Sequence, residues 1–193
     1  MKHFLTDTNE RQIENPKFYE ESLERVRVRQ RQLSRRQKDS KTREKARIRL
    51  AKAFERVVNQ RNDFLHKLSK FYIQNYDVVA VEKLNIAGMA RSNLAGKILD
   101  ASWGKFQQML LYKAESAGRV VLEVNPRGTS KKRHGLDRNY AAALCILERG
   151  LVGLGWPELT PVEMEPLLSI PASAVVAGQA LSPKQEASCE SWG

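Results

Sequence analysis

The residues best suited to chemistry are two carboxylates at the ends of expected secondary-structure elements. Glu82 follows the apolar run Val78–Val81, and Asp137 precedes a helical pattern of apolar residues. Carboxylates at strand ends above a layered sheet can hold two metal ions for hydrolysis, but such a site needs several acidic ligands. Taken singly, Glu82 is better explained as a surface residue paired with Lys83. A helix N-cap explains Asp137 at least as well as metal binding does.

Other metal and redox chemistry has little support in the sequence. The chain has two cysteines, Cys145 and Cys189, and three scattered histidines. Neither a disulfide framework nor a four-cysteine zinc site can be built from these residues, so we expect no zinc and a reducing compartment. No signal peptide and no run of about 18 apolar residues is visible, which predicts a cytoplasmic protein without a membrane partner.

Positive charge is concentrated in one segment. The formal net charge of the chain is +11, and residues 25–50 hold twelve Lys or Arg against Asp39 and Glu44. Clustered cations favour polyanion partners, because each contact with a phosphate releases a counterion. A solvated helix face is the alternative, although the charge density favours phosphate binding. The candidate nucleic-acid-binding residues are Arg25, Arg27, Arg29, Arg31, Arg35, Arg36, Lys38, Lys41, Arg43, Lys45, Arg47 and Arg49.

Two helices are expected to carry this charge, over residues 17–38 and 43–74, and the second has the more regular apolar spacing. A hairpin is expected before them. After them the pattern predicts strands 77–82 and 119–124 and helices 99–117 and 136–149. This alternation is typical of an α/β layer fold. Residues 151–193 are rich in proline and lack a sustained period, so we expect a mobile tail there.

Five segments occur in the order found in one known family. They are Val81–Met89, Asp100–Phe106, Leu111–Gly118, Val124–Ser130 and Asp137–Gly150. Together they resemble the TnpB/OrfB transposase family, whose members are RuvC-like RNA-guided nucleases that act on DNA. The first segment is similar to the second RuvC motif of that family, and the last to its third motif.

This resemblance implies an incomplete RNase H-like (RuvC) domain over residues 1–150, with residues 17–75 as a long basic helical insertion and 151–193 as the tail. The family's first catalytic Asp is expected just before Lys2, where the given chain begins, so the central strand of the sheet is expected to be missing. The zinc ribbon expected between Ser130 and Asp137 is absent, and Asn139 stands where the family has an acidic metal ligand.

The resemblance therefore implies a nucleic-acid-binding protein of DNA transposition, with DNA and a guide RNA as partners, that is deficient as a nuclease. Glu82 is the expected remnant of the catalytic site, Asp137 a partial substitute, and Mg²⁺ binding at Glu82 is expected to be weak. A nucleoid-associated location would follow. Two alternatives stay open, namely an active endonuclease completed by another chain and a decayed remnant without function. The sequence does not indicate an oligomeric state.

Overall fold

The computed structural model describes residues 2–129, 136–155 and 174–178, and every structural statement below concerns those residues. The chain separates into two compact units. One consists of residues 17–68, and the other combines residues 1–16 with residues 69–193. Since α2 continues from one unit into the other, each unit is described by itself.

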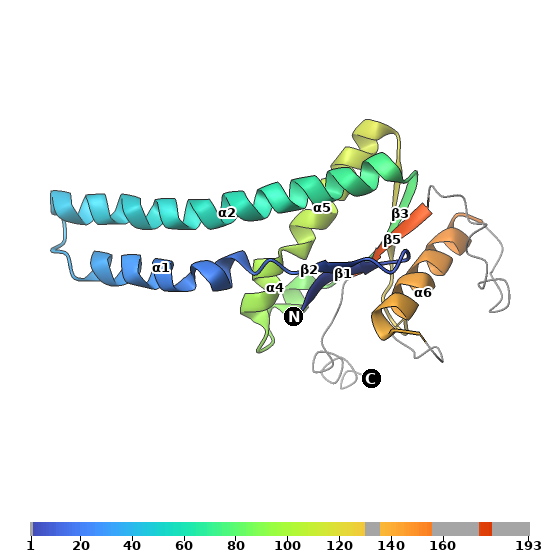
Figure 1. Ribbon diagram of the computed structural model, residues 1–193, viewed down its shortest axis with the longest axis horizontal. Coiled ribbons are helices and arrows are strands. Elements are labelled where there is room, and N and C mark those ends of the chain that lie inside the picture. Colours follow the sequence, from blue (N-terminus) through green and yellow to red (C-terminus); the bar gives the residue numbers. More distant parts are fainter. Residues whose placement is uncertain (1, 130–135, 156–173, 179–193) are drawn as a thin grey trace. The chain divides into compact units, whose positions relative to one another are not determined.

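The larger unit is built on a mixed five-stranded sheet (Figure 1). Its strands are β1 (His3–Asp7), β2 (Gln12–Glu14), β3 (Val78–Glu82), β4 (Val120–Val124) and β5 (Ala174–Gly178). Their order across the sheet is β2-β1-β5-β3-β4. β3 runs parallel to β4 and β5, whereas β1 runs antiparallel to β2 and β5. Strands and helices thus form the α/β architecture that the sequence predicts.

The strand β3 lies inside the sheet because its side chains suit burial on both faces. Val79, Ala80 and Val81 are all nearly inaccessible to solvent. The helix α6 (Arg138–Gly153) packs on the face that carries Ala80, where Ile146 and Leu147 contribute to one apolar cluster. A side chain at Gly150 would bring its Cβ atom within 3.2 Å of the Ala80 Cβ atom, so this glycine allows α6 to approach the sheet closely.

Three further helices follow β3, namely α3 (Ile86–Met89), α4 (Ala95–Ala101) and α5 (Trp103–Ala117). The indole Nε1 of Trp103 donates a hydrogen bond to the Phe4 carbonyl oxygen at 3.0 Å, which ties α5 to β1. The sequence predicts one helix over residues 99–117, but the structure divides this region at Ser102. That residue adopts a left-handed conformation with φ of 56°, which interrupts the helical geometry.

The smaller unit contains α1 (Phe18–Ser34) and most of α2 (Lys41–Asn75), which run antiparallel to each other (Figure 1). Val26 on α1 and Val57 and Leu65 on α2 are buried. The turn between the helices is stabilised by Arg43, whose guanidinium Nη1 donates to the carbonyl oxygens of Leu33 at 3.4 Å and Arg36 at 3.2 Å.

The C-terminal region differs from the sequence-based expectation. Residues 174–178 form β5 between β1 and β3, so the expectation that the centre of the sheet would lack a strand was wrong. The physical reason is that β3 needs backbone hydrogen-bond partners on both edges, and β5 provides the second set. α6 also extends to Gly153, beyond the predicted end at 149. The rest of the expected tail, 156–173 and 179–193, lies outside the described residues.

The pairing of β5 gives a test of this topology. Val176 stands opposite Ala80 in the parallel ladder. Val176→Pro removes a backbone N–H from a central strand, where proline is tolerated poorly, and should lower the free energy of unfolding by about 3 kcal/mol. Val176→Thr keeps the N–H and serves as the matched control. Equal urea midpoints for the two variants would contradict the central position of β5.

Candidate metal and nucleic-acid sites

Glu82, the last residue of β3, carries a buried carboxyl group rather than the surface carboxylate considered for an isolated glutamate. The residue is 5% exposed, and its Oε2 atom has no hydrogen-bond partner among the described residues. Its backbone oxygen accepts a hydrogen bond from the Gln107 side chain on α5. Because burial disfavours the charged form, the pKa of the Glu82 carboxyl group is raised to about 7.

The strand register shows what lies beside Glu82. Thr6 on β1 pairs with Gly178 on β5, and Val81 on β3 pairs with Ala177. Glu82 follows Val81, so Thr6, Gly178 and Glu82 occupy one level across three strands, and residues at one level point to the same face. The hydroxyl oxygen of Thr6 is also buried without a partner. Glycine adds no side chain between the two polar groups.

The third-motif residues occupy the start of α6. Asp137 is the N-cap of this helix, and its Oδ1 atom accepts hydrogen bonds from the backbone N–H groups of Asn139 at 3.0 Å and Tyr140 at 3.2 Å. These bonds satisfy donors that a helix start leaves unpaired. The capping interpretation of Asp137 is therefore realised in the structure, and Asn139 contributes its backbone N–H to the cap.

These residues do not fit a two-metal centre. Such a centre needs several carboxylates to bridge and balance the charge of two ions. Within the described part of the chain, no three His, Cys, Asp or Glu residues come close enough together to hold a metal ion. Glu82 offers one unpartnered carboxyl oxygen and Thr6 one hydroxyl oxygen, while Asp137 is engaged in capping.

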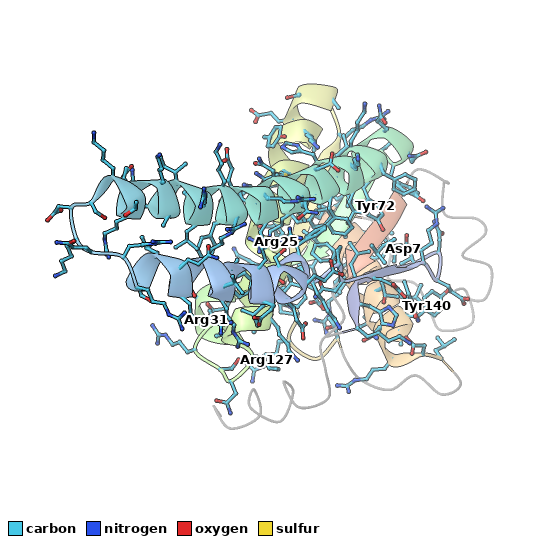
Figure 2. All side chains as sticks on the ribbon, turned by 60° about the vertical axis from the view of Figure 1, so that its left-hand side comes forward. Asp7, Arg25, Arg31, Tyr72, Arg127 and Tyr140 are labelled. Carbon is cyan, nitrogen blue, oxygen red and sulfur yellow. The ribbon has the colours of Figure 1, made fainter. Side chains whose placement is uncertain are left out.

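Sequence reasoning missed a buried carboxylate at Asp7, the last residue of β1, directly after Thr6. Asp7 is fully buried, and its Oδ1 atom accepts from the backbone N–H groups of Asn9 at 2.9 Å and Arg11 at 3.0 Å. The hydroxyl of Tyr72 on α2 donates to Asp7 Oδ2 at 3.1 Å, and the two side chains face each other in Figure 2. Burial, followed by the charge of Asp7, raises the pKa of the Tyr72 phenol.

Asp7 therefore organises the β1–β2 hairpin and attaches it to the end of α2. A second contact joins the same two elements, because the Asn9 amide donates to the Tyr76 hydroxyl at 2.9 Å. The signal in the sequence was the turn Asp7-Thr8-Asn9, which predicts a hairpin but not its partner on a helix 65 residues away. This carboxylate is saturated with hydrogen bonds, which explains its burial structurally.

The twelve basic candidates all lie on α1, on α2 or in the turn between them, and Figure 2 labels Arg25 and Arg31 on α1. Their roles differ. Arg31 pairs with Glu24 at 2.9 Å, and Arg47 pairs with Glu44 at 2.6 Å, both on exposed surface. Arg43 is partly occupied by the turn carbonyl oxygens. Arg29 donates to the Gln32 side chain at 3.0 Å, and the other eight candidates have no side-chain partner in the described part of the chain.

Comparison with known proteins identifies the chain. A family model described as "Probable transposase" matches residues 1–93, and a model described as "Cas12f1-like, TNB domain" matches residues 103–147. The chain belongs to the TnpB/OrfB transposase family. The two matched ranges together include the five segments that carried the resemblance, except residues 100–102 and 148–150.

Two curated relatives of this TnpB/OrfB chain match over part of their length. One, named "Putative RNA-guided DNA endonuclease", is from Streptomyces pristinaespiralis and is 35% identical over 124 residues, or 64% of this chain and 31% of the relative. The other, named "Putative RNA-guided DNA endonuclease InsQ", is from Escherichia coli (strain K12) and is 30% identical over 119 residues, or 53% of this chain and 30% of the relative. The matched region thus spans less than a third of each relative.

One further observation concerns membranes. Among the helices in the described ranges, none combines the length and the apolar character that are needed to cross a bilayer.

The buried carboxyl group of Glu82 predicts a pH-dependent effect. Its pKa is raised to about 7 in the folded chain, so the folded state holds a proton that the unfolded state releases above the ordinary pKa of 4.5. Stability should therefore fall as the pH rises from 4.5 to 7 and then level off. Glu82→Gln cannot ionise, so its unfolding free energy should not show this fall. The difference in unfolding free energy between the variant and the natural chain should therefore shift by about 3 kcal/mol in favour of the variant between pH 4 and pH 8. A difference in unfolding free energy that stays constant across this range would refute the isolated, buried state of Glu82.

The hydrogen bond between Tyr72 and Asp7 predicts a second effect. Tyr72→Phe leaves one oxygen of a buried carboxylate without its donor and should lower the unfolding free energy by roughly 1.5–3 kcal/mol. A double-mutant cycle with Asp7→Asn isolates the pair, and a coupling energy near zero would show that the contact does not stabilise the fold.

Proposed function

We propose that this chain is a nucleic-acid-binding TnpB/OrfB protein that holds RNA and DNA through its basic helices and does not itself cleave DNA. The observation that carries the proposal is the contrast between its two units. The helical unit 17–68 has seventeen Lys and Arg against seven Asp and Glu, which is +10 of the chain's +11. Among the described residues of the sheet unit, Glu82 is the one buried carboxyl group with an unpartnered oxygen.

The names of the relatives support RNA and DNA as partners, because both are called RNA-guided DNA endonucleases. Phosphate contacts from Lys and Arg bind nucleic acid through its backbone and carry no sequence information by themselves. In this proposal residues 17–75 are the basic insertion of an RNase H-like domain that spans residues 1–150. The chain then acts at nucleic acid in the cytoplasm, associated with the nucleoid.

The catalytic part of the proposal rests on charge. Glu82 is the only expected acidic ligand that lies on the sheet face without a partner, Asp137 caps α6, and Asn139 is neutral. An amide oxygen can coordinate a metal ion but brings no negative charge to balance it. We therefore propose that Mg²⁺ binds weakly at Glu82 and that the chain holds no structural zinc.

The second candidate is an endonuclease that another chain completes. The unpartnered carboxyl group of Glu82 favours this candidate, because a second chain that supplied further carboxylates would find one metal ligand already in place. The position of β5 weighs against it, because the central place in the sheet is already taken by the chain's own strand.

A cleavage assay separates these two candidates. The purified chain, mixed with Mg²⁺ or Mn²⁺, a matched guide RNA and a target plasmid, should give no more cleavage than the Glu82→Ala control. Asn139→Asp alone should also stay at background, since two carboxylates still fall short of a bridged pair of ions. Cleavage by the natural chain that disappears in Glu82→Ala would establish the endonuclease instead.

A further inference from the structure

The helix α2 carries a regular row of cations that differs from the other basic residues of the helical unit. Lys45, Arg49, Lys52 and Arg56 follow one another at intervals of four, three and four residues. This spacing places all four on one face of the helix, over an axial length of about 16 Å. Two of them, Lys52 and Arg56, lie beyond the basic segment 25–50 that the sequence singled out.

All four side chains of this row are exposed. None of them makes an ion pair or a hydrogen bond within the described residues, whereas other cations of the unit do. Arg31 pairs with Glu24, Arg47 with Glu44, and Lys67 with Asp63 at 2.7 Å. A cation that is paired with an acidic neighbour adds little to the positive electrostatic potential around the unit. The paired and the unpaired cations are therefore not equivalent, although each carries one positive charge.

The arrangement on α1 gives a useful contrast. Arg25 and Arg27 are also exposed, but residues two apart in a helix point to different sides. The α1 arginines therefore spread around the helix, while the α2 row faces in one direction. A linear ligand with evenly repeated negative charge can contact the α2 row along its length, which a single small anion cannot do.

We propose that Lys45, Arg49, Lys52 and Arg56 form a track for the phosphodiester backbone of one nucleic-acid strand. The inference rests on the proposed function and deepens it by naming which face of the helical unit meets the nucleic acid. The track reads phosphates and not bases, so its contribution is independent of sequence and sensitive to salt.

The test compares two triple variants that remove the same charge. Arg49→Gln, Lys52→Gln and Arg56→Gln change the row. Arg31→Gln, Arg47→Gln and Lys67→Gln change three ion-paired cations of the same unit. Glutamine is a good helix former, so the helices should persist in both triple variants, which circular dichroism checks. The probe is a labelled RNA–DNA hybrid duplex, and the measurement is the slope of log K against log salt by fluorescence anisotropy.

The row variant should flatten this slope by about 2–3, which corresponds to roughly 0.7–0.9 for each lost phosphate contact, and the paired variant by less than about 1. Arg49→Lys, Lys52→Arg and Arg56→Lys together should keep the natural slope. Equal flattening in the two Gln variants would overturn the track while leaving the proposed function intact. Absence of measurable binding by the natural chain at low salt would instead refute the proposed function, and the track with it.

Discussion

The sheet unit depends on one constraint, which is that a parallel strand at the centre of a sheet must be hydrogen-bonded along both edges. β3 satisfies it through β4 on one side and β5 on the other. Unpaired buried N–H and C=O groups each cost roughly 1–3 kcal/mol, so a vacant edge beside β3 would remove much of a small domain's stability. A five-residue strand from far along the chain supplies those partners, and in doing so it joins the β1–β2 hairpin to the parallel strands.

Asp7 stabilises the opposite edge of the same sheet by a different means. The hairpin β1–β2 is short, and two strands alone are marginally stable in water. The buried carboxylate binds the backbone of its own turn and the hydroxyl of Tyr72, so that the hairpin is fixed to the end of α2. The cation of Arg11 adds to this attachment, since it lies 5.2 Å from the centre of the Phe71 ring.

The sequence predicts the helices and strands whose formation depends mainly on their own local residue pattern. The apolar period of α2 and the β-branched runs of β3 and β4 are local signals, and the structure confirms all three elements. β5 was missed because its five residues Ala174–Gly178 lie in a proline-rich region and gain their partners only in the folded sheet. The break at Ser102 was missed for a related reason, because a serine in left-handed conformation has no strong sequence signal. Among the candidate site residues, Glu82 was correctly placed at a strand end, but its burial depends on tertiary packing that the local sequence does not specify.

The state of Glu82 bears on why binding and cleavage can separate in such a chain. In a metal centre, cations balance the negative charge of buried carboxylates. For Glu82 a proton can balance the negative charge instead, because burial raises the pKa of its carboxyl group to about 7. The sheet therefore tolerates this carboxyl group without a metal ion. A metal centre requires ligands from several elements in register, and each missing ligand weakens it. A row of cations on α2 requires only that one helix forms, which the apolar core of its own unit ensures. The proposed binding of nucleic acid through this row therefore tolerates changes in the sheet unit that catalysis would not.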